Sequence, residues 1–135
     1  MVNASRVTQQ DNAPKTILVV EDEPLLRLVV SELLRMRKLT VVETASAEEA
    51  EAVLAAGVHV DLVFTDVRMP GRFDGMELTR RVRARNPQLP VVVTSGHLDG
   101  SGVMDGVSFL RKPYLPSGAV TLISALLSSE ETDDI

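Results

Sequence analysis

Polar side chains that can do chemistry follow four short apolar runs of this chain. In chain order, the residues at these positions are Glu21, Asp22, Asp66, Thr94, Ser95 and Lys112. Carboxylates, hydroxyls and an ammonium group gathered at one place are what metal-assisted transfer of a phosphoryl group to a carboxylate needs. The fold must therefore bring the ends of these runs together for such chemistry to occur.

The apolar pattern of the chain alternates between strand-like and helix-like segments. Runs rich in β-branched residues predict strands at 17–20, 41–42, 61–65, 91–94 and 107–110. Apolar residues three and four apart predict helices from 24 to about 37, from the capping box of Ser46 and Glu49 to Gly57, around 78–82, and from Pro116 onward. This alternation predicts a doubly wound α/β fold, in which the carboxyl ends of parallel strands carry the site.

Length and composition point to one small domain. The chain has 135 residues, of which 44% are hydrophobic, and it has no cysteine. We expect a flexible tail at 1–14, the folded domain at 15–128 and an acidic tail at 129–135. The absence of cysteine excludes disulfides and thiolate metal sites, and with no apolar stretch of about 18 residues we expect a cytoplasmic protein without a membrane span. The net charge of -5 disfavours nonspecific binding to nucleic acid.

Three carboxylates among the strand-end residues indicate a metal site. Glu21, Asp22 and Asp66 offer hard oxygen ligands, which suit Mg²⁺. With the cation bound, Asp66 can act as a nucleophile and form an aspartyl-phosphate. The simpler alternative is that Asp66 only ends a strand, that Thr94 is a β-forming residue and that Lys112 is solvated.

The motifs around these residues resemble a known family. In chain order they are Glu21-Asp22, Asp66-Val67-Arg68-Met69-Pro70, Asp74-Gly75, Thr94-Ser95-Gly96 and Lys112-Pro113. Over about 16–127 this combination resembles the response regulator receiver domain of bacterial two-component signalling. The resemblance implies a flavodoxin-like sheet of five parallel strands in the order 2-1-3-4-5. It also implies a stand-alone signalling switch rather than an enzyme, with only metal-assisted self-phosphorylation and slow autodephosphorylation.

The resemblance also implies roles for individual residues. Asp66 would accept a phosphoryl group from the histidine of a sensor kinase or phosphotransfer protein. Mg²⁺, for which Mn²⁺ can substitute, would be bound by Asp66, by Asp22 directly, by Glu21 through water and by the backbone carbonyl of Arg68. The phosphoryl group would bind Lys112, Thr94 and Ser95; Thr94 and Phe109 would form the switch, and the Lys112–Pro113 peptide would be cis. We expect an unknown downstream protein partner, no direct DNA binding, no membrane contact, and a monomer or weak dimer.

Two segments depart from the family pattern. The turn 69–75 is one residue longer than expected, and the extra residue can reposition Arg72 or Phe73 over the phosphoryl pocket; the sequence does not say whether it does. The segment 95–106 contains four glycines, and each interior glycine costs a helix about 1 kcal/mol. The fourth helix is therefore predicted to be short or replaced by a loop at 98–105.

Other functions remain open from the residues alone. A pseudo-receiver would keep the fold as a protein interaction module without phosphorylation. An aspartyl-phosphate phosphatase of the haloacid dehalogenase type would need a second acid where Arg68 stands, and a nucleotide or flavin module would need a glycine-rich loop after the first strand. His59 and His97 are expected to be structural or solvated. Arg80, Arg81, Arg83 and Arg85 are expected to form an exposed helix face, with contact to acidic partners or nucleic acid as the alternative.

Overall fold

A single parallel sheet forms the centre of the molecule. The structure is a computed structural model that describes residues 13–96 and 105–133, with side chains for 13–96 and 105–128. Within these residues the strands are β1 (Thr16–Val20), β2 (Thr40–Thr44), β3 (Leu62–Asp66), β4 (Val91–Ser95) and β5 (Val107–Arg111). Their spatial order is β2-β1-β3-β4-β5, which confirms the order 2-1-3-4-5 implied by the motifs. Because every pairing is parallel, the carboxyl ends of the strands lie at one edge of the sheet.

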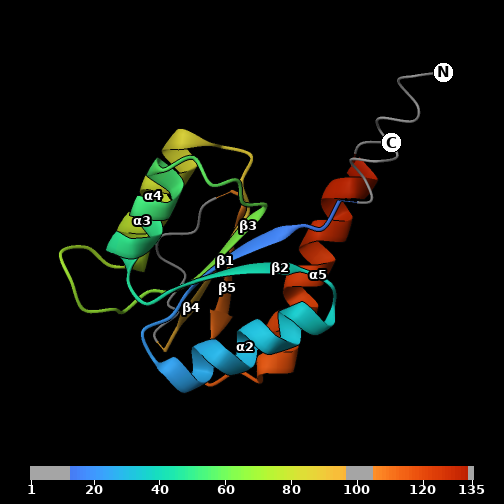
Figure 1. The fold of residues 1–135 in the computed structure, drawn as a ribbon, viewed down its shortest axis with the longest axis horizontal. Helices are drawn as coiled ribbons and strands as arrows, with labels where there is room; N and C mark the ends of the chain where they lie inside the picture. Colours follow the sequence, from blue (N-terminus) through green and yellow to red (C-terminus); the bar gives the residue numbers. More distant parts are fainter. Residues whose placement is uncertain (1–12, 97–104, 134–135) are drawn as a thin grey trace.

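The described helices cover both faces of this sheet. They are α2 (Pro24–Met36), α3 (Ala47–Ala55), α4 (Gly75–Arg85) and α5 (Pro116–Asp133). Figure 1 shows α2 and α5 on one face and α3 and α4 on the other, which confirms the doubly wound arrangement. The segment 98–105, predicted to be a short helix or a loop, lies outside the described residues except for Asp105. None of the helices that the structure describes is both long and apolar enough to cross a membrane.

Local sequence signals fix where the helices begin. Pro24 occupies the first position of α2, where a missing N–H costs nothing. At α3, Ser46 Oγ accepts the N–H of Glu49 at 3.1 Å, and the Glu49 carboxylate accepts the N–H of Ala45 at 2.9 Å. The predicted capping box is therefore present, although Glu49 accepts the N–H of Ala45 instead of the N–H of Ser46.

The core lies in two layers, because successive side chains of a strand point to opposite faces. Leu18, Val20, Val63, Val91 and Val93 pack towards α3 and α4, whereas Ile17, Val19, Phe64 and Val92 pack towards α2 and α5. All residues of β3 and β4 are buried. In these two central strands the polar side chains are the last two residues, so they lie at the carboxyl edge of the sheet.

Candidate functional site

Three carboxylates converge at the carboxyl edge of the sheet. Asp66 is the last residue of β3, and Glu21 and Asp22 directly follow β1. One carboxylate oxygen of each lies within 4.8 Å of the others. Glu21 is 2% exposed and Asp66 is 5% exposed, whereas Asp22 is exposed. The parallel strands thus bring together the three acids that the sequence placed at strand ends.

Crowding and burial make this cluster suited to a divalent cation. Burial raises the pKa of Glu21 to about 7, and the negative charge of Asp66 adds to this, although a hydrogen bond from the Glu23 N–H (3.0 Å) opposes it. Glu21 Oε1 is buried and has no hydrogen-bond partner among the described residues. An orphaned carboxylate oxygen beside two further carboxylates is a donor set that fits Mg²⁺.

Lys112 provides the counter-charge of the cluster. Its Nζ lies 2.5 Å from Asp66 Oδ2, although 46 residues separate the two in sequence. Burial lowers the pKa of Lys112, but the hydrogen bond and charge of Asp66 outweigh this effect, so the net shift is upward. The Lys112 N–H donates to the Ser95 carbonyl at 2.9 Å, and the Lys112–Pro113 peptide is cis. These contacts hold the ammonium group over Asp66, where it can bind a phosphoryl oxygen.

Thr94 places an unsatisfied hydroxyl beside Asp66. The two residues are paired across β3 and β4, and Thr94 is 1% exposed. Its Oγ1 is buried without a hydrogen-bond partner among the described residues. A buried hydroxyl costs free energy until it is paired, so a phosphoryl oxygen on Asp66 would satisfy it. Ser95, the next residue, is also buried, at 7% exposed.

Phe109 lies on β5 opposite Val93. It is half-buried and packs against the core layer beneath α3 and α4. Thr94 is paired with Leu110, so Thr94 and Phe109 are one position apart in register and their side chains leave the strands on opposite faces of the sheet. Phe109 is not locked in a fully buried position.

The turn after β3 is tied closely to Asp66. The Arg68 N–H donates to Asp66 Oδ1 at 3.2 Å, and the Gly75 N–H donates to the Val67 carbonyl at 2.8 Å. A Cβ at Gly75 would lie only 1.9 Å from the Asp66 carbonyl oxygen. Gly75 is therefore required by space, a role that the Asp-Gly motif alone did not reveal.

The rest of this turn is held by contacts with α3 and α4. The Arg72 N–H donates to Glu48 Oε2 on α3 at 2.7 Å. The guanidinium of Arg81 on α4 stacks on the Phe73 ring at 4.2 Å. The effect of the extra residue, which the sequence left open, is therefore seen as packing of the turn against these two helices.

Tyr114 is a neighbour of the site that sequence reasoning missed. Its ring packs edge-on against Phe64 at 6.1 Å between centroids. Burial raises the pKa of Tyr114, and the charges of Glu21 and Asp66 add to the shift. Its hydroxyl is buried without a partner among the described residues. The available signal was its place directly after Lys112-Pro113.

His59 lies away from the site. His59 is exposed and pairs with Asp61 at 3.0 Å, beyond the other edge of the sheet. His97 lies outside the described residues. No chemical role is assigned to either.

The fold and the converging groups define a doubly wound α/β protein with an acidic site and a lysine at the carboxyl edge of its sheet. Residues 17–121 match the model of the response regulator receiver domain. The chain belongs to this family.

Individual relatives agree with this assignment. The chain is 33% identical over 125 residues to the C4-dicarboxylate transport transcriptional regulatory protein DctD of Rhizobium meliloti, covering 89% of this chain but 26% of that protein. A response regulator receiver protein from Sinorhizobium medicae is 32% identical with a TM-score of 0.77, covering 85% of this chain and 95% of that one. A CheY-like receiver domain protein from Methanospirillum hungatei shares the fold, with a TM-score of 0.81 at 21% identity, covering 90% of this chain and 99% of that one. The chain spans about a quarter of the length of DctD.

Proposed function

We propose that this protein is a phosphorylation-dependent signalling switch whose phosphoacceptor is Asp66. The observation that carries the proposal is the contact of Asp66 with Lys112 at 2.5 Å, inside a cluster of three carboxylates. Membership of the receiver family supports phosphoacceptor signalling and interaction with histidine kinases or phosphotransfer proteins. The family acts by signalling, so we assign no enzymatic turnover of a substrate to this chain.

The proposed reaction transfers a phosphoryl group from a phosphohistidine. An Asp66 carboxylate oxygen forms a bond to phosphorus as the phosphorus–nitrogen bond breaks, and the imidazole leaves. Asp22, Asp66, the Arg68 carbonyl and, through water, Glu21 would hold Mg²⁺, for which Mn²⁺ can substitute. A bound cation neutralises charge on the transferring oxygens. Lys112 and Ser95 then bind the phosphoryl group.

Thr94 and Phe109 carry the proposed conformational response. A phosphoryl group adds a charge of about -1.5 to -2 and three acceptor oxygens. The free hydroxyl of Thr94 would turn towards these oxygens, and Phe109 would fill the space that Thr94 leaves. The surface beside β5 would change, and an unidentified downstream partner would read the change.

Exposed apolar side chains beside the site suit a phosphodonor protein. Leu25 and Leu28, on the first turns of α2, are 68% and 51% exposed, and Leu115 is 75% exposed. Leu25 closely follows Asp22, and Leu115 closely follows Lys112. A donor must approach Asp66 past these residues, and burying apolar side chains stabilises such a complex. A cytoplasmic location is part of this proposal.

Intact-mass measurement after incubation with Mg²⁺ and acetyl phosphate tests the phosphoacceptor. We expect the native chain to gain one phosphoryl group, Asp66→Asn to gain none, and the control Glu32→Gln on α2 to behave as native. The same comparison with a phosphorylated histidine phosphotransfer domain tests the protein donor. Equal labelling of Asp66→Asn and the native chain, or no labelling from either donor, would sink the assignment.

A further inference from the structure

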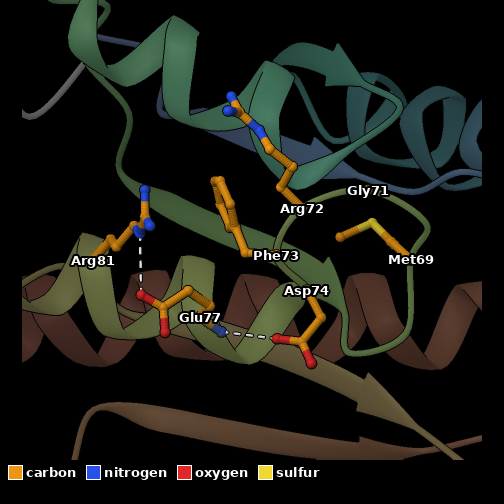
Figure 2. A pocket seen from close by; sticks show the side chains of 7 residues that line it. All are labelled: Met69, Gly71, Arg72, Phe73, Asp74, Glu77 and Arg81. Atoms are coloured by element: carbon orange, nitrogen blue, oxygen red, sulfur yellow. Dashed lines mark hydrogen bonds and ion pairs between the residues drawn. The ribbon is translucent and has the colours of Figure 1, made fainter.

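The turn 68–75 and the start of α4 form a surface whose side chains the phosphoryl chemistry does not use. Figure 2 shows the pocket there, with the Phe73 ring between the side chains of Arg72 and Arg81. The pocket has a volume of about 540 Å³ and is lined by Met69, Gly71, Arg72, Phe73, Asp74, Glu77 and Arg81. A second pocket of about 390 Å³ shares Met69 and Asp74 with it and extends the surface to Arg68. We call these two pockets together the turn groove.

The turn groove has a fixed shape. Gly71 adopts a φ of 126°, and a Cβ there would lie 2.5 Å from Glu48 Oε1, so the turn can rest on α3 only with glycine at this position. Asp74 accepts the N–H groups of Met76 and Glu77 at 3.1 and 3.0 Å, which caps α4. The groove is therefore built by contacts at both of its ends.

The charges of the groove leave two arginines available. Glu77 pairs with Arg80 at 2.9 Å and with Arg81 at 3.1 Å, so its carboxylate is neutralised. Asp74 is engaged in the helix cap. Arg68 and Arg72 are exposed, and within the described part of the chain neither guanidinium forms an ion pair. Both guanidinium groups are thus accessible to a ligand in a protein whose net charge is -5, and the charge of Arg72 also acts on Glu48, whose pKa it helps to lower.

The chemistry of the groove identifies the kind of ligand it fits. Arginine forks bind carboxylates in two-pronged pairs, and the lining beside Arg72 includes the Phe73 ring, one face of which carries the Arg81 guanidinium. We infer that the turn groove is a docking site for an acidic segment of a partner protein, with an apolar side chain over Phe73 and carboxylates on Arg68 and Arg72.

The groove is also connected to the phosphoacceptor, and this part of the inference rests on the proposed function. The Arg68 N–H donates to Asp66 Oδ1, so a phosphoryl group on Asp66 changes the acceptor that holds one end of the groove. The affinity for the acidic segment should therefore differ between the phosphorylated and unphosphorylated chains. We expect phosphorylation to change this affinity, in either direction, by about threefold or more.

Fluorescence anisotropy with a fluorescein-labelled peptide, in which one Phe is flanked by Glu residues, tests the docking site on the unphosphorylated chain. We expect Arg72→Gln and Arg68→Gln each to weaken binding, and the double variant to weaken it about tenfold or more. Glu48 holds the backbone N–H of Arg72 and not its guanidinium, so Arg72→Gln leaves the turn intact. The control Arg37→Gln, at the residue that directly follows α2 in the opposite layer, should change binding less than about twofold.

Several results would overturn the inference. No binding of the peptide, equal binding of the same peptide with Gln in place of Glu, or equal loss in Arg37→Gln would each do so. Displacement of the peptide by a single-stranded oligonucleotide at lower concentration would assign the groove to nucleic acid. Self-association of the chain that is lost in Arg72→Gln would assign the groove to a second copy.

Intact mass measured on the same acetyl phosphate samples separates the docking site from the proposed function. A chain that is not labelled but still binds the peptide contradicts the proposed function alone. Equal affinity of fully labelled and unlabelled chains contradicts the coupling.

Discussion

At the scale of single residues, Gly75 shows how little space surrounds the phosphoacceptor. Alanine usually favours a helix, but at Gly75 its Cβ would lie 1.9 Å from the Asp66 carbonyl oxygen, which is backbone and cannot yield. We expect Gly75→Ala to lower the free energy of unfolding by about 1–3 kcal/mol and to slow labelling of Asp66. The matched control is Gly118→Ala in α5, where nothing lies within 4 Å and a gain of about 0.5–1 kcal/mol is expected. Urea unfolding measures both; a Gly75→Ala variant as stable as the native chain would contradict this account.

The residues that face one another across strand ends could be predicted from sequence. The approach of Asp66 to Lys112 follows from parallel strands that end at the same edge, although the chain separates them by 46 residues. Gly75 and Tyr114 could not be predicted in the same way. Their roles depend on close approach between atoms of different elements, and neither apolar periodicity nor turn chemistry encodes such distances.

At the scale of elements, Arg83 joins α4 to the start of β5. Its guanidinium donates to the Leu89 carbonyl at 2.8 Å and to the Asp105 carbonyl at 2.6 Å, and it occupies the space where a Cβ of Gly106 would lie. We expect Arg83→Met to lower the free energy of unfolding by about 1–2 kcal/mol, because two carbonyls lose a charged donor. Arg80→Met is the control on the same helix, since its exposed pair with Glu77 contributes about 0–1 kcal/mol. Equal losses in urea unfolding would show that Arg83 is no more than a surface charge.

The sequence predicted elements best where both faces are buried. The runs that became β3 and β4 were predicted to within one residue at each end, because each begins with three buried apolar side chains and ends in buried polar ones. Only Val41 and Val42 indicated β2, which extends over Thr40–Thr44. β2 is an edge strand and only partly buried, so polar residues can stand at its ends, and the apolar pattern of the sequence covers only its middle. The path of the turn 69–75 escaped prediction because Glu48, more than twenty residues earlier, holds it.

At the scale of the whole molecule, the acidic cluster couples the stability of the fold to pH and to metal. Burial raises the pKa of Glu21 from 4.5 to about 7 in the folded protein without metal. Between these two values the folded chain binds more protons than the unfolded chain. The free energy of unfolding therefore falls as pH rises through this window, by at most about 1.4 kcal/mol per pH unit from this group.

Urea unfolding in a chelator from pH 5 to pH 7.5 measures this dependence. We expect Glu21→Gln to flatten the profile, because glutamine removes the titration but keeps the side-chain size. The control Glu77→Gln should leave the profile in this window unchanged, since hydrogen bonds from Arg81 and Arg80 lower the pKa of Glu77 and so move its titration away from this window. Mg²⁺ binds only the ionised carboxylates, so at a fixed concentration it should stabilise the native chain more at pH 7.5 than at pH 5. A native profile that stays flat in chelator, or equal stabilisation by Mg²⁺ at the two pH values, would show that Glu21 does not set this coupling.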